Sequence, residues 1–295
     1  MIQYNPKDWF TFIFRFHKSD TFMKLLPLMI GIAIYSYVVG YLEMEYWQLS
    51  QNDQLKNITI MHTTLGFVIS LLLAYRTNTA YDRWWEGRKI WGQLTNASRN
   101  FALKLDAMLI DPADKSFFKT MIPAFALELA TYLRRQETEQ MLWQEDGDSV
   151  GVEMIKNIVK TKHRPSQVCK LMHTRINALV TQGKLTPEQA LLLNPELSAF
   201  ADILGACERI KNTPIPYSYS AFIKKFIFVY IMTLPFGYVF NLGYYVVPVV
   251  VFIFYVLASL ELIAEEIEDP FGADANDLPI DVMAKNIKKH VGEIL

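Results

Sequence analysis

The chain has 295 residues, of which 52% are hydrophobic and 20% are charged, and its formal net charge is −1. An ordinary soluble domain is less apolar and carries about 25% charged residues, and a disordered chain is far less hydrophobic. The charge gives no electrostatic case for binding nucleic acid, and two cysteines, Cys169 and Cys207, are too few for a disulfide-rich secreted fold.

The first 24 residues mix aromatic rings with lysines and arginines and have no continuous apolar core. A signal peptide needs such a core and a cleavage site after it, so this segment does not resemble one. Aromatic and basic side chains together are typical of a helix that lies in the membrane interface. We therefore expect residues 1–24 to form an interfacial helix on the inner membrane face.

Three runs of the sequence contain no Asp, Glu, Lys or Arg. They cover residues 25–42, 57–75 and 226–260, and they are 18, 19 and 35 residues long. A helix of about 20 apolar residues crosses a bilayer. The first two runs therefore predict one membrane span each, and the third is long enough to hold two.

A turn signal, Asn241-Leu242-Gly243, lies near the middle of the third run. Because glycine can end a helix there, the run predicts a hairpin of two spans, residues 222–240 and 244–262. Charged side chains near the ends of this hairpin are expected to snorkel or to form ion pairs, and they are Lys224, Lys225 and Glu261.

Lysine and arginine gather on one side of the predicted spans. The loop between the first two spans holds Glu43, Glu45 and Asp53 against a single base, Lys56. Since basic residues favour the cytoplasmic side, we expect this loop outside and both termini in the cytoplasm, with the protein in the plasma (inner) membrane. The basic residues near the span ends are Lys7, Arg15, Lys18, Lys24, Arg76, Arg83, Arg88, Lys89, Lys211, Lys224 and Lys225.

The segment between the second and third spans shows helical periodicity and no strand alternation. It predicts helices at 95–110, 115–140, 166–182 and 187–211, and a loop at 145–151. The expected fold class is an all-α integral membrane protein with four transmembrane helices per subunit and a cytosolic helical domain. The expected divisions are 1–24 interfacial helix, 25–75 first two spans, 76–221 cytosolic helical region, 222–262 hairpin of spans, and 263–295 acidic belt and C-terminal segment.

The second span carries two rows of residues at four-residue spacing. Small residues at Gly66, Ser70 and Ala74 favour close helix packing in lipid. The neighbouring row is polar at its outer end and bulky and apolar further in. If several copies surrounded an axis, this second row would form a vestibule and a hydrophobic constriction, although it could equally face lipid or the bundle core. Its residues are Thr59, Thr63, Phe67, Leu71 and Tyr75.

Residues 76–92 follow this span and read RTNTAYDRWWEGRKIWG. Tryptophans beside basic residues are typical of an inner membrane boundary; an anion-binding mouth made by Arg76 and Arg83 is the alternative. This stretch resembles the signature of the bestrophin family, as do residues 205–217 (GACERIKNTPIPY) and 265–272 (EEIEDPFG), with wording closest to the bacterial branch. Its candidate inner-mouth residues are Arg76, Asn78, Asp82, Arg83, Trp84 and Trp85.

Bestrophins are pentameric ion channels with one central pore, and the second helix of each subunit lines a narrow neck. The resemblance therefore implies a homopentamer in the lipid bilayer. Family neck residues occur at i, i+4 and i+8, the last being eight residues before the motif arginine. Counting back from Arg83 gives Tyr75, Leu71 and Phe67. The family also has a cytosolic aperture, for which Leu185 is the candidate.

Animal bestrophins bind calcium through a dense acidic run after Pro-Phe-Gly. Here Pro270-Phe271-Gly272 precedes only Asp274, Asn276 and Asp277. Since calcium favours six to eight oxygen ligands, we expect no calcium site, no other metal and no cofactor beyond the permeant monovalent ions. The preceding acids are expected to form a solvated polar belt between subunits, and they are Glu265, Glu266, Glu268 and Asp269.

The sign of the permeant ion stays open at this level. Animal bestrophins pass chloride, whereas some bacterial relatives favour monovalent cations, and the neck row is uncharged. The acidic outer loop favours cations, while Arg76 and Arg83 favour anions. The bacterial resemblance tips the expectation slightly toward cations, with chloride or another anion as the alternative.

Other classes of membrane protein fit the sequence less well. An enzyme would need a catalytic motif, yet no GxSxG, P-loop or HExxH occurs, and His163 and His173 are not at a metal-ligand spacing. A secondary transporter would tend to show intramembrane charges in repeated halves. The first two predicted spans contain no charged residue, and the sequence shows no internal repeat. A non-conducting membrane scaffold remains a rival.

Overall fold

The computed structural model describes residues 21–47, 58–134 and 163–295. Every regular element within these ranges is helical, so the predicted all-α fold class is confirmed. The interfacial helix expected for residues 1–24 lies almost wholly outside the described residues, and so do Asp53, Lys56 and the loop expected at 145–151. The chain divides into two compact units.

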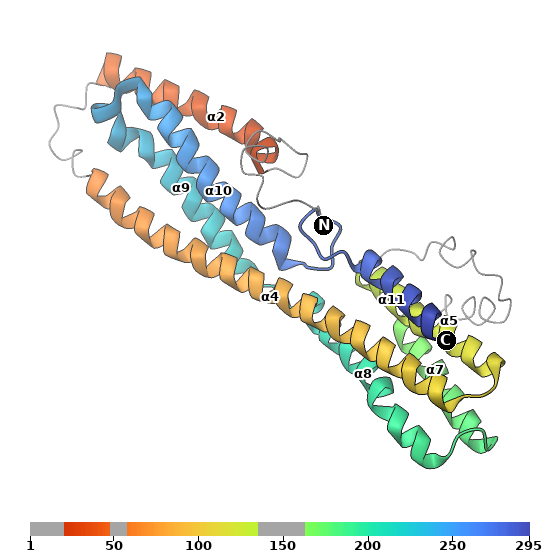
Figure 1. Ribbon diagram of the computed structural model, residues 1–295. Helices are drawn as coiled ribbons and strands as arrows, with labels where there is room; N and C mark the ends of the chain where they lie inside the picture. Colours follow the sequence, from red (N-terminus) through yellow and green to blue (C-terminus); the bar gives the residue numbers. More distant parts are fainter. Residues whose placement is uncertain (1–20, 48–57, 135–162) are drawn as a thin grey trace. The chain divides into compact units, whose positions relative to one another are not determined.

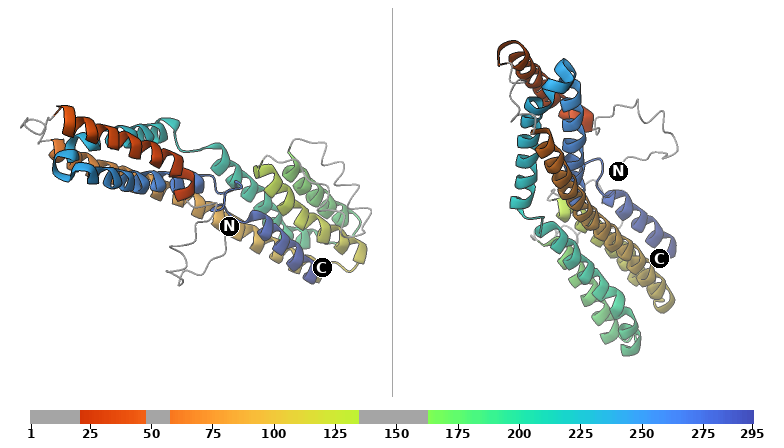
Figure 2. Two further views of the ribbon diagram at one scale, coloured as in Figure 1. Left: turned by 90° about the horizontal axis from the view of Figure 1, so that it is seen from above. Right: turned by 90° about the vertical axis from the view of Figure 1, so that its left-hand side faces the viewer.

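The first unit contains Met1–Arg83, Pro214–Glu268 and Asp274–Asn276. Helix α2 packs along α10, and α9 contacts both of them, as the ribbon views show (Figures 1 and 2). The elements of this unit are α2 (Thr21–Leu42) with the π-helical turn η1 (Glu43–Trp47), the first part of α4 (Ile58–Met108), α9 (Tyr217–Leu242), the 3-10 turn η4 (Gly243–Tyr245) and α10 (Val246–Glu268).

The turn between α9 and α10 lies where the sequence predicts it. Helix α9 ends at Leu242, and Gly243 has a φ of +55°. Glycine adopts this left-handed region without the steric cost that a side chain brings. The 35-residue uncharged run therefore holds two helices, as expected.

Four helical segments are long and apolar enough to cross a membrane: Thr21–Trp47, Ile58–Met108, Pro187–Asn212 and Tyr217–Glu268. The last contains both α9 and α10, which correspond to the predicted hairpin. The segment Pro187–Asn212 differs, because its apolar residues pack into the core of the second unit. The first unit is apolar outside as well as inside, with large side chains such as Ile34 and Phe252 exposed, as expected of helices that meet lipid.

The second unit contains Trp84–Thr213, Asp269–Ala273 and Asp277–Leu295. One hydrophobic core joins its helices, with the aromatic rings of Phe101, Phe118, Phe125 and Phe200 at the centre. Its elements are the rest of α4, α5 (Pro112–Arg134), α7 (Arg164–Thr181), α8 (Pro187–Asn212) and α11 (Ile280–Ile294).

Two features of these helices differ from the expectation. The helix expected at 95–110 is the end of α4, which runs unbroken from Ile58 because no proline interrupts it. Helix α11 was not expected at all, although its buried residues Ile280, Ala284, Ile287 and Val291 have the three- and four-residue spacing of an amphipathic helix. Helices α7 and α8 begin and end within a few residues of their predicted bounds.

Candidate functional site

The proposed neck row lies on the exposed face of α4. Phe67, Leu71 and Tyr75 are 65%, 44% and 67% exposed. The opposite face holds Ile69 and Leu73, each 1% exposed and part of the core of the first unit. A helix turns by about 100° per residue, which places these two sets on opposite sides. The row is therefore not packed in the core of its own chain, and lipid or another subunit remains to cover it.

The polar outer end of this row is only partly free. Thr63 is exposed, and its hydroxyl donates to the carbonyl of Thr59 at 2.9 Å. The Thr59 hydroxyl donates to the carbonyl of Gly237 on α9 at 3.3 Å. Thr63 thus continues the exposed row, whereas Thr59 is half-buried and tied to α9.

The small residues of α4 do not all pack against the same neighbour. A Cβ atom on Gly66 would lie 2.8 Å from the Tyr230 hydroxyl, so Gly66 lets α4 and α9 approach closely. Ser70 and Ala74 are exposed instead, and the Ser70 hydroxyl donates back to the Gly66 carbonyl at 2.7 Å. Packing of Ser70 and Ala74 against another helix therefore stays a prediction.

His62 is a packing residue between α4 and α9. It is fully buried, and its Nε2 lies 3.0 Å from the Thr233 hydroxyl. Its ring centroid is 5.9 Å from those of Tyr230 and Tyr238. A Cβ atom on Gly237 would lie 2.9 Å from His62 Nδ1, so the absence of a side chain at Gly237 makes room for the imidazole.

The first arginine of the signature is buried and neutralised within the chain. Arg76 is 1% exposed, and its Nη2 donates to Glu268 Oε2 at 2.6 Å. Its Nε lies 3.6 Å from Glu261 Oε2, and Arg83 Nε donates to the Glu268 carbonyl at 3.0 Å. Arg76 is thus not exposed at an anion-binding mouth, and its charge holds the end of α10 against α4.

The acids at the end of α10 meet cations from three helices. Lys24 of α2 pairs with Glu266, Arg76 of α4 with Glu268, and Lys224 of α9 with Glu265 at 2.8 Å. We call this group the inner clasp, and its residues are Lys24, Arg76, Lys224, Glu261, Glu265, Glu266 and Glu268.

The expectation of a solvated belt is wrong for Glu266 and Glu268. The side chains of Glu266 and Glu268 are only 6% and 15% exposed and are paired inside one subunit. Asp269 is exposed, as expected of a solvated acid. The charged residues near the hairpin ends are expected to snorkel or to form ion pairs. Lys224 pairs with Glu265, and Glu261 faces Arg76.

Two further signature residues continue the neck row. Asn78 and Asp82 are exposed, and Asp82 lies seven residues after Tyr75, which is close to two full helical turns. The sequence predicts Asn78 and Asp82 in the inner mouth, and the helix adds that both follow the neck row on the exposed side of α4. Trp84 packs against the second core, and Trp85 is 46% exposed.

The prediction that Leu185 lines a cytosolic aperture is wrong. Leu185 is 2% exposed and lies in the core of the second unit, just before the capping box that Thr186 and Gln189 form at the start of α8. A buried side chain cannot line an opening. The exposed apolar residues on the first turns of α8 are Leu191 (72%) and Leu192 (57%).

The residues after Pro-Phe-Gly are engaged in the fold. The Asn276 amide donates to Glu266 Oε2 at 2.6 Å. Asp277 is 2% exposed and lies against Gly272, where a Cβ atom would be 2.5 Å from Asp277 Oδ2. Among the described residues, no three His, Cys, Asp or Glu side chains gather in a way that would hold a metal ion.

Comparison with known proteins covers almost the entire chain. Residues 1–293 match the family model described as bacterial/fungal bestrophin protein. A voltage-dependent anion channel-forming protein of Nostoc sp. is 32% identical over 98% of this chain and 92% of its own length. Protein YneE of Salmonella typhi, with the same descriptive name, is 31% identical over 98% of this chain and 92% of its own length.

A solved structure of similar fold is the crystal structure of a bacterial bestrophin homolog from Klebsiella pneumoniae. It has a TM-score of 0.82 and 27% sequence identity, and the similarity covers 92% of this chain and 98% of that one. The three signature stretches and the all-helical fold are consistent with the family match, which covers nearly the full length of the chain. The chain is a member of the bacterial and fungal bestrophin family.

Proposed function

We propose that this chain is the subunit of a homopentameric ion channel of the plasma (inner) membrane, with the exposed row of α4 lining the pore. The observation that carries the proposal is the row itself. Phe67, Leu71 and Tyr75 are exposed on the side of α4 opposite the bundle, at the positions that family resemblance assigns to the neck. Relatives along nearly the full chain are named channel-forming proteins.

The neck works through its apolar side chains. Five copies of Phe67 and Leu71 around an axis form a constriction from which water withdraws, and such a constriction gates by dewetting. Tyr75 adds a hydroxyl at the inner end, which makes that end wetter. The exposed Leu191 and Leu192 of α8 replace Leu185 as candidates for a second, cytosolic constriction.

Small anions are the first candidate for the permeant ion. The relatives from Nostoc and Salmonella are both named anion channel-forming proteins. Because of these names, anions are placed ahead of the cations that the bacterial resemblance slightly favoured.

Monovalent cations are the second candidate, and Asp82 favours them. In a pentamer, Asp82 would form a ring of five carboxylates two turns inside Tyr75, and rings of acids favour cations. Arg76, which the sequence offered as an attraction for anions, is neutralised by Glu268 and exposes no charge.

A planar bilayer with a potassium chloride gradient tests both candidates. A channel produces single-channel currents, and the sign of their reversal potential identifies the permeant ion. If cations permeate, Asp82→Asn should move the reversal potential toward zero, while Asp202→Asn, which changes an exposed acid on α8, should not. An anion-selective wild type would exclude the cation candidate, and absence of current under all conditions would contradict the channel.

The size and metal dependence of the purified protein test the rest of the proposal. A pentamer has five times the subunit mass of 34.1 kDa, so light scattering that finds a monomer or dimer would contradict it. The proposal includes no metal cofactor. A calcium chelator should therefore leave the conductance unchanged.

A further inference from the structure

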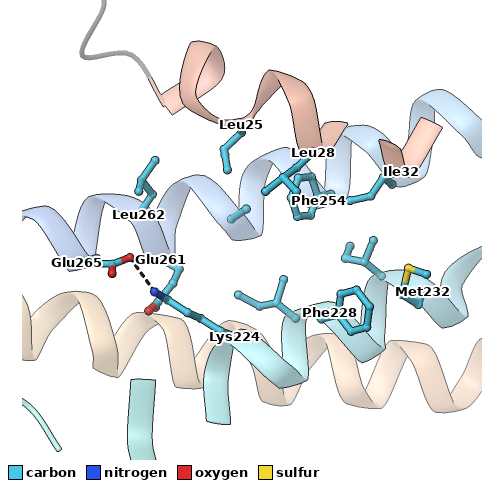
Figure 3. A pocket seen from close by; sticks show the side chains of 13 residues that line it. Leu25, Leu28, Ile32, Lys224, Phe228, Met232, Phe254, Glu261, Leu262 and Glu265 are labelled. Carbon is cyan, nitrogen blue, oxygen red and sulfur yellow. Dashed lines mark hydrogen bonds and ion pairs between the residues drawn. The ribbon is translucent and has the colours of Figure 1, made fainter. Parts of the chain in front are cut away.

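A groove on the first unit lies between α2, α9 and α10, away from the neck row of α4. Its volume is about 400 Å³, which falls in the range of small-molecule pockets, about 300–1,000 Å³. The walls are almost entirely aliphatic and aromatic, with Leu28 and Ile32 on one side, Phe228 and Met232 on the other, and Phe254 next to Leu28 (Figure 3).

Charged side chains close one end of this groove. Lys224 and Glu265 are paired at 2.8 Å and are each about half exposed, at 50% and 52%. Both line the groove, as does Glu261 beside them (Figure 3). The opposite end, at Ile32 and Met232, carries no charge. The groove is therefore amphipathic along its length, like a lipid.

Glu261 adds a buried negative charge at this end of the groove. The residue is 4% exposed, and neither carboxylate oxygen accepts a hydrogen bond. Its nearest cation is Arg76 Nε at 3.6 Å, which is too long for a hydrogen bond. Both carboxylate oxygens of Glu261 are buried, so its negative charge acts on this end of the groove through space and favours a cation there.

We propose that this groove binds a phospholipid with a zwitterionic, primary-amine headgroup of the phosphatidylethanolamine class. An acyl chain lies along the apolar walls. A phosphate oxygen accepts from Lys224, and the ammonium donates to the exposed Glu265, next to the buried charge of Glu261. Each headgroup charge then meets an opposite charge, whereas phosphatidylglycerol would draw Lys224 to its phosphate and bring no ammonium for Glu265, and the quaternary ammonium of phosphatidylcholine has no N–H to donate.

Native mass spectrometry of the full-length protein tests the proposal. The protein is reconstituted in vesicles with equal amounts of phosphatidylethanolamine, phosphatidylglycerol and phosphatidylcholine, extracted in mild detergent, and analysed for retained lipid per subunit. The wild type should retain phosphatidylethanolamine in preference to both other lipids. Equal retention of the three lipids, or preference for another of them, would overturn the proposal.

Matched variants locate the site. Lys224→Met and Glu265→Gln should each lower phosphatidylethanolamine retention about two- to fivefold, while Lys225→Gln, an exposed neighbour outside the groove, should leave it unchanged. Ala258→Phe fills the groove and should abolish retention, whereas Val256→Phe on the same helix but outside the groove should not.

Unchanged retention in Ala258→Phe, or equal effects of Lys224→Met and Lys225→Gln, would overturn the assignment to this groove. If Ala258→Phe prevents assembly because a neighbouring subunit fills the groove, the comparison of Glu265→Gln with Lys225→Gln still decides. In that case both variants would keep the wild-type lipid profile, which contradicts a lipid site.

Discussion

At the scale of single residues, the inner clasp and two glycines determine how the helices of the first unit pack against one another. Arg76 reaches two acids of α10 that are far from it in sequence. Gly66 and Gly237 place α4 against α9, because each receives a side chain of the opposite helix. The sequence displayed Arg76 as part of a signature but offered no sign of its partners, since pairing between distant segments depends on how the helices pack.

Gly237→Ala tests the close approach of α4 and α9. The new methyl group would lie 2.9 Å from His62 Nδ1 and 3.0 Å from Ile58 Cγ2, so the helices must separate, at a cost of about 1–3 kcal/mol. Thermal unfolding in detergent should show a lower midpoint. Gly31→Ala is the matched control, because nothing lies within 4 Å of its Cβ position, and it should be neutral or slightly stabilising. Equal effects of the two changes would contradict the packing described.

Arg76→Met tests the inner clasp. The substitution leaves Glu268 and the buried Glu261 without their cation, and breaking a buried pair costs about 3–5 kcal/mol. The variant should unfold at a markedly lower temperature than wild type. Adding Glu268→Gln to Arg76→Met should recover part of the loss, because it removes one of the stranded charges. A double variant no more stable than Arg76→Met alone would argue against this pairing, and Lys225→Met is the exposed control.

At the scale of elements, the helices followed from the sequence where one physical signal dominated. The uncharged runs predicted the membrane helices, and Asn241-Leu242-Gly243 predicted the turn that Gly243 makes. The continuity of α4 past Arg76 was missed because aromatic and charged residues suggested a boundary, although no proline ends the helix there. Helix α11 was missed although its apolar spacing is regular.

A cluster of charges joins α5 to the turn between α7 and α8. Lys184 lies 2.7 Å from both Asp111 and Asp114, and Arg175 also pairs with Asp114. The hydrogen bond from Lys184 lowers the pKa of Asp111 below its ordinary value of 3.8. The hydrogen bond to Asp111, and then that to Asp114, raises the pKa of Lys184 above 10.5.

Lys184→Met should therefore destabilise the protein in a defined pH window. The contribution of Asp111 is present above pH 3.8 and is lost as the pH falls through its lowered pKa. That of Lys184 is present below pH 10.5 and is lost as the pH rises through its raised pKa. Between these pH limits, the free energy of unfolding of the variant should be lower than that of wild type by a constant amount. Outside the limits, this difference should shrink. Lys170→Met, an exposed change on α7, should show no such profile.

At the scale of the whole molecule, the chain divides into two helical units, each with its own hydrophobic core. The first unit contains the uncharged runs, and all Asp, Glu, Lys and Arg residues of the sequence lie outside these runs. Family resemblance supplied the neck positions, and the structure adds that they are exposed on the single chain. In the proposed pentamer these faces would meet around the pore axis, and Ser70, Ala74 and Asp82, which are exposed on α4, would face a neighbouring subunit or the pore.

The central claim is that Phe67, Leu71 and Tyr75 form the narrow part of an ion pore. Single-channel recording in planar bilayers tests it by comparing wild type with the Phe67→Ala/Leu71→Ala/Tyr75→Ala variant. The control is Ile34→Ala/Val229→Ala/Phe252→Ala, which changes exposed apolar residues on the other three helices of the first unit. Smaller side chains keep the neck wet, so the neck variant should carry larger currents than wild type, and the control should match wild type. Absence of current in every protein, or equal currents in the neck variant and wild type, would contradict the account.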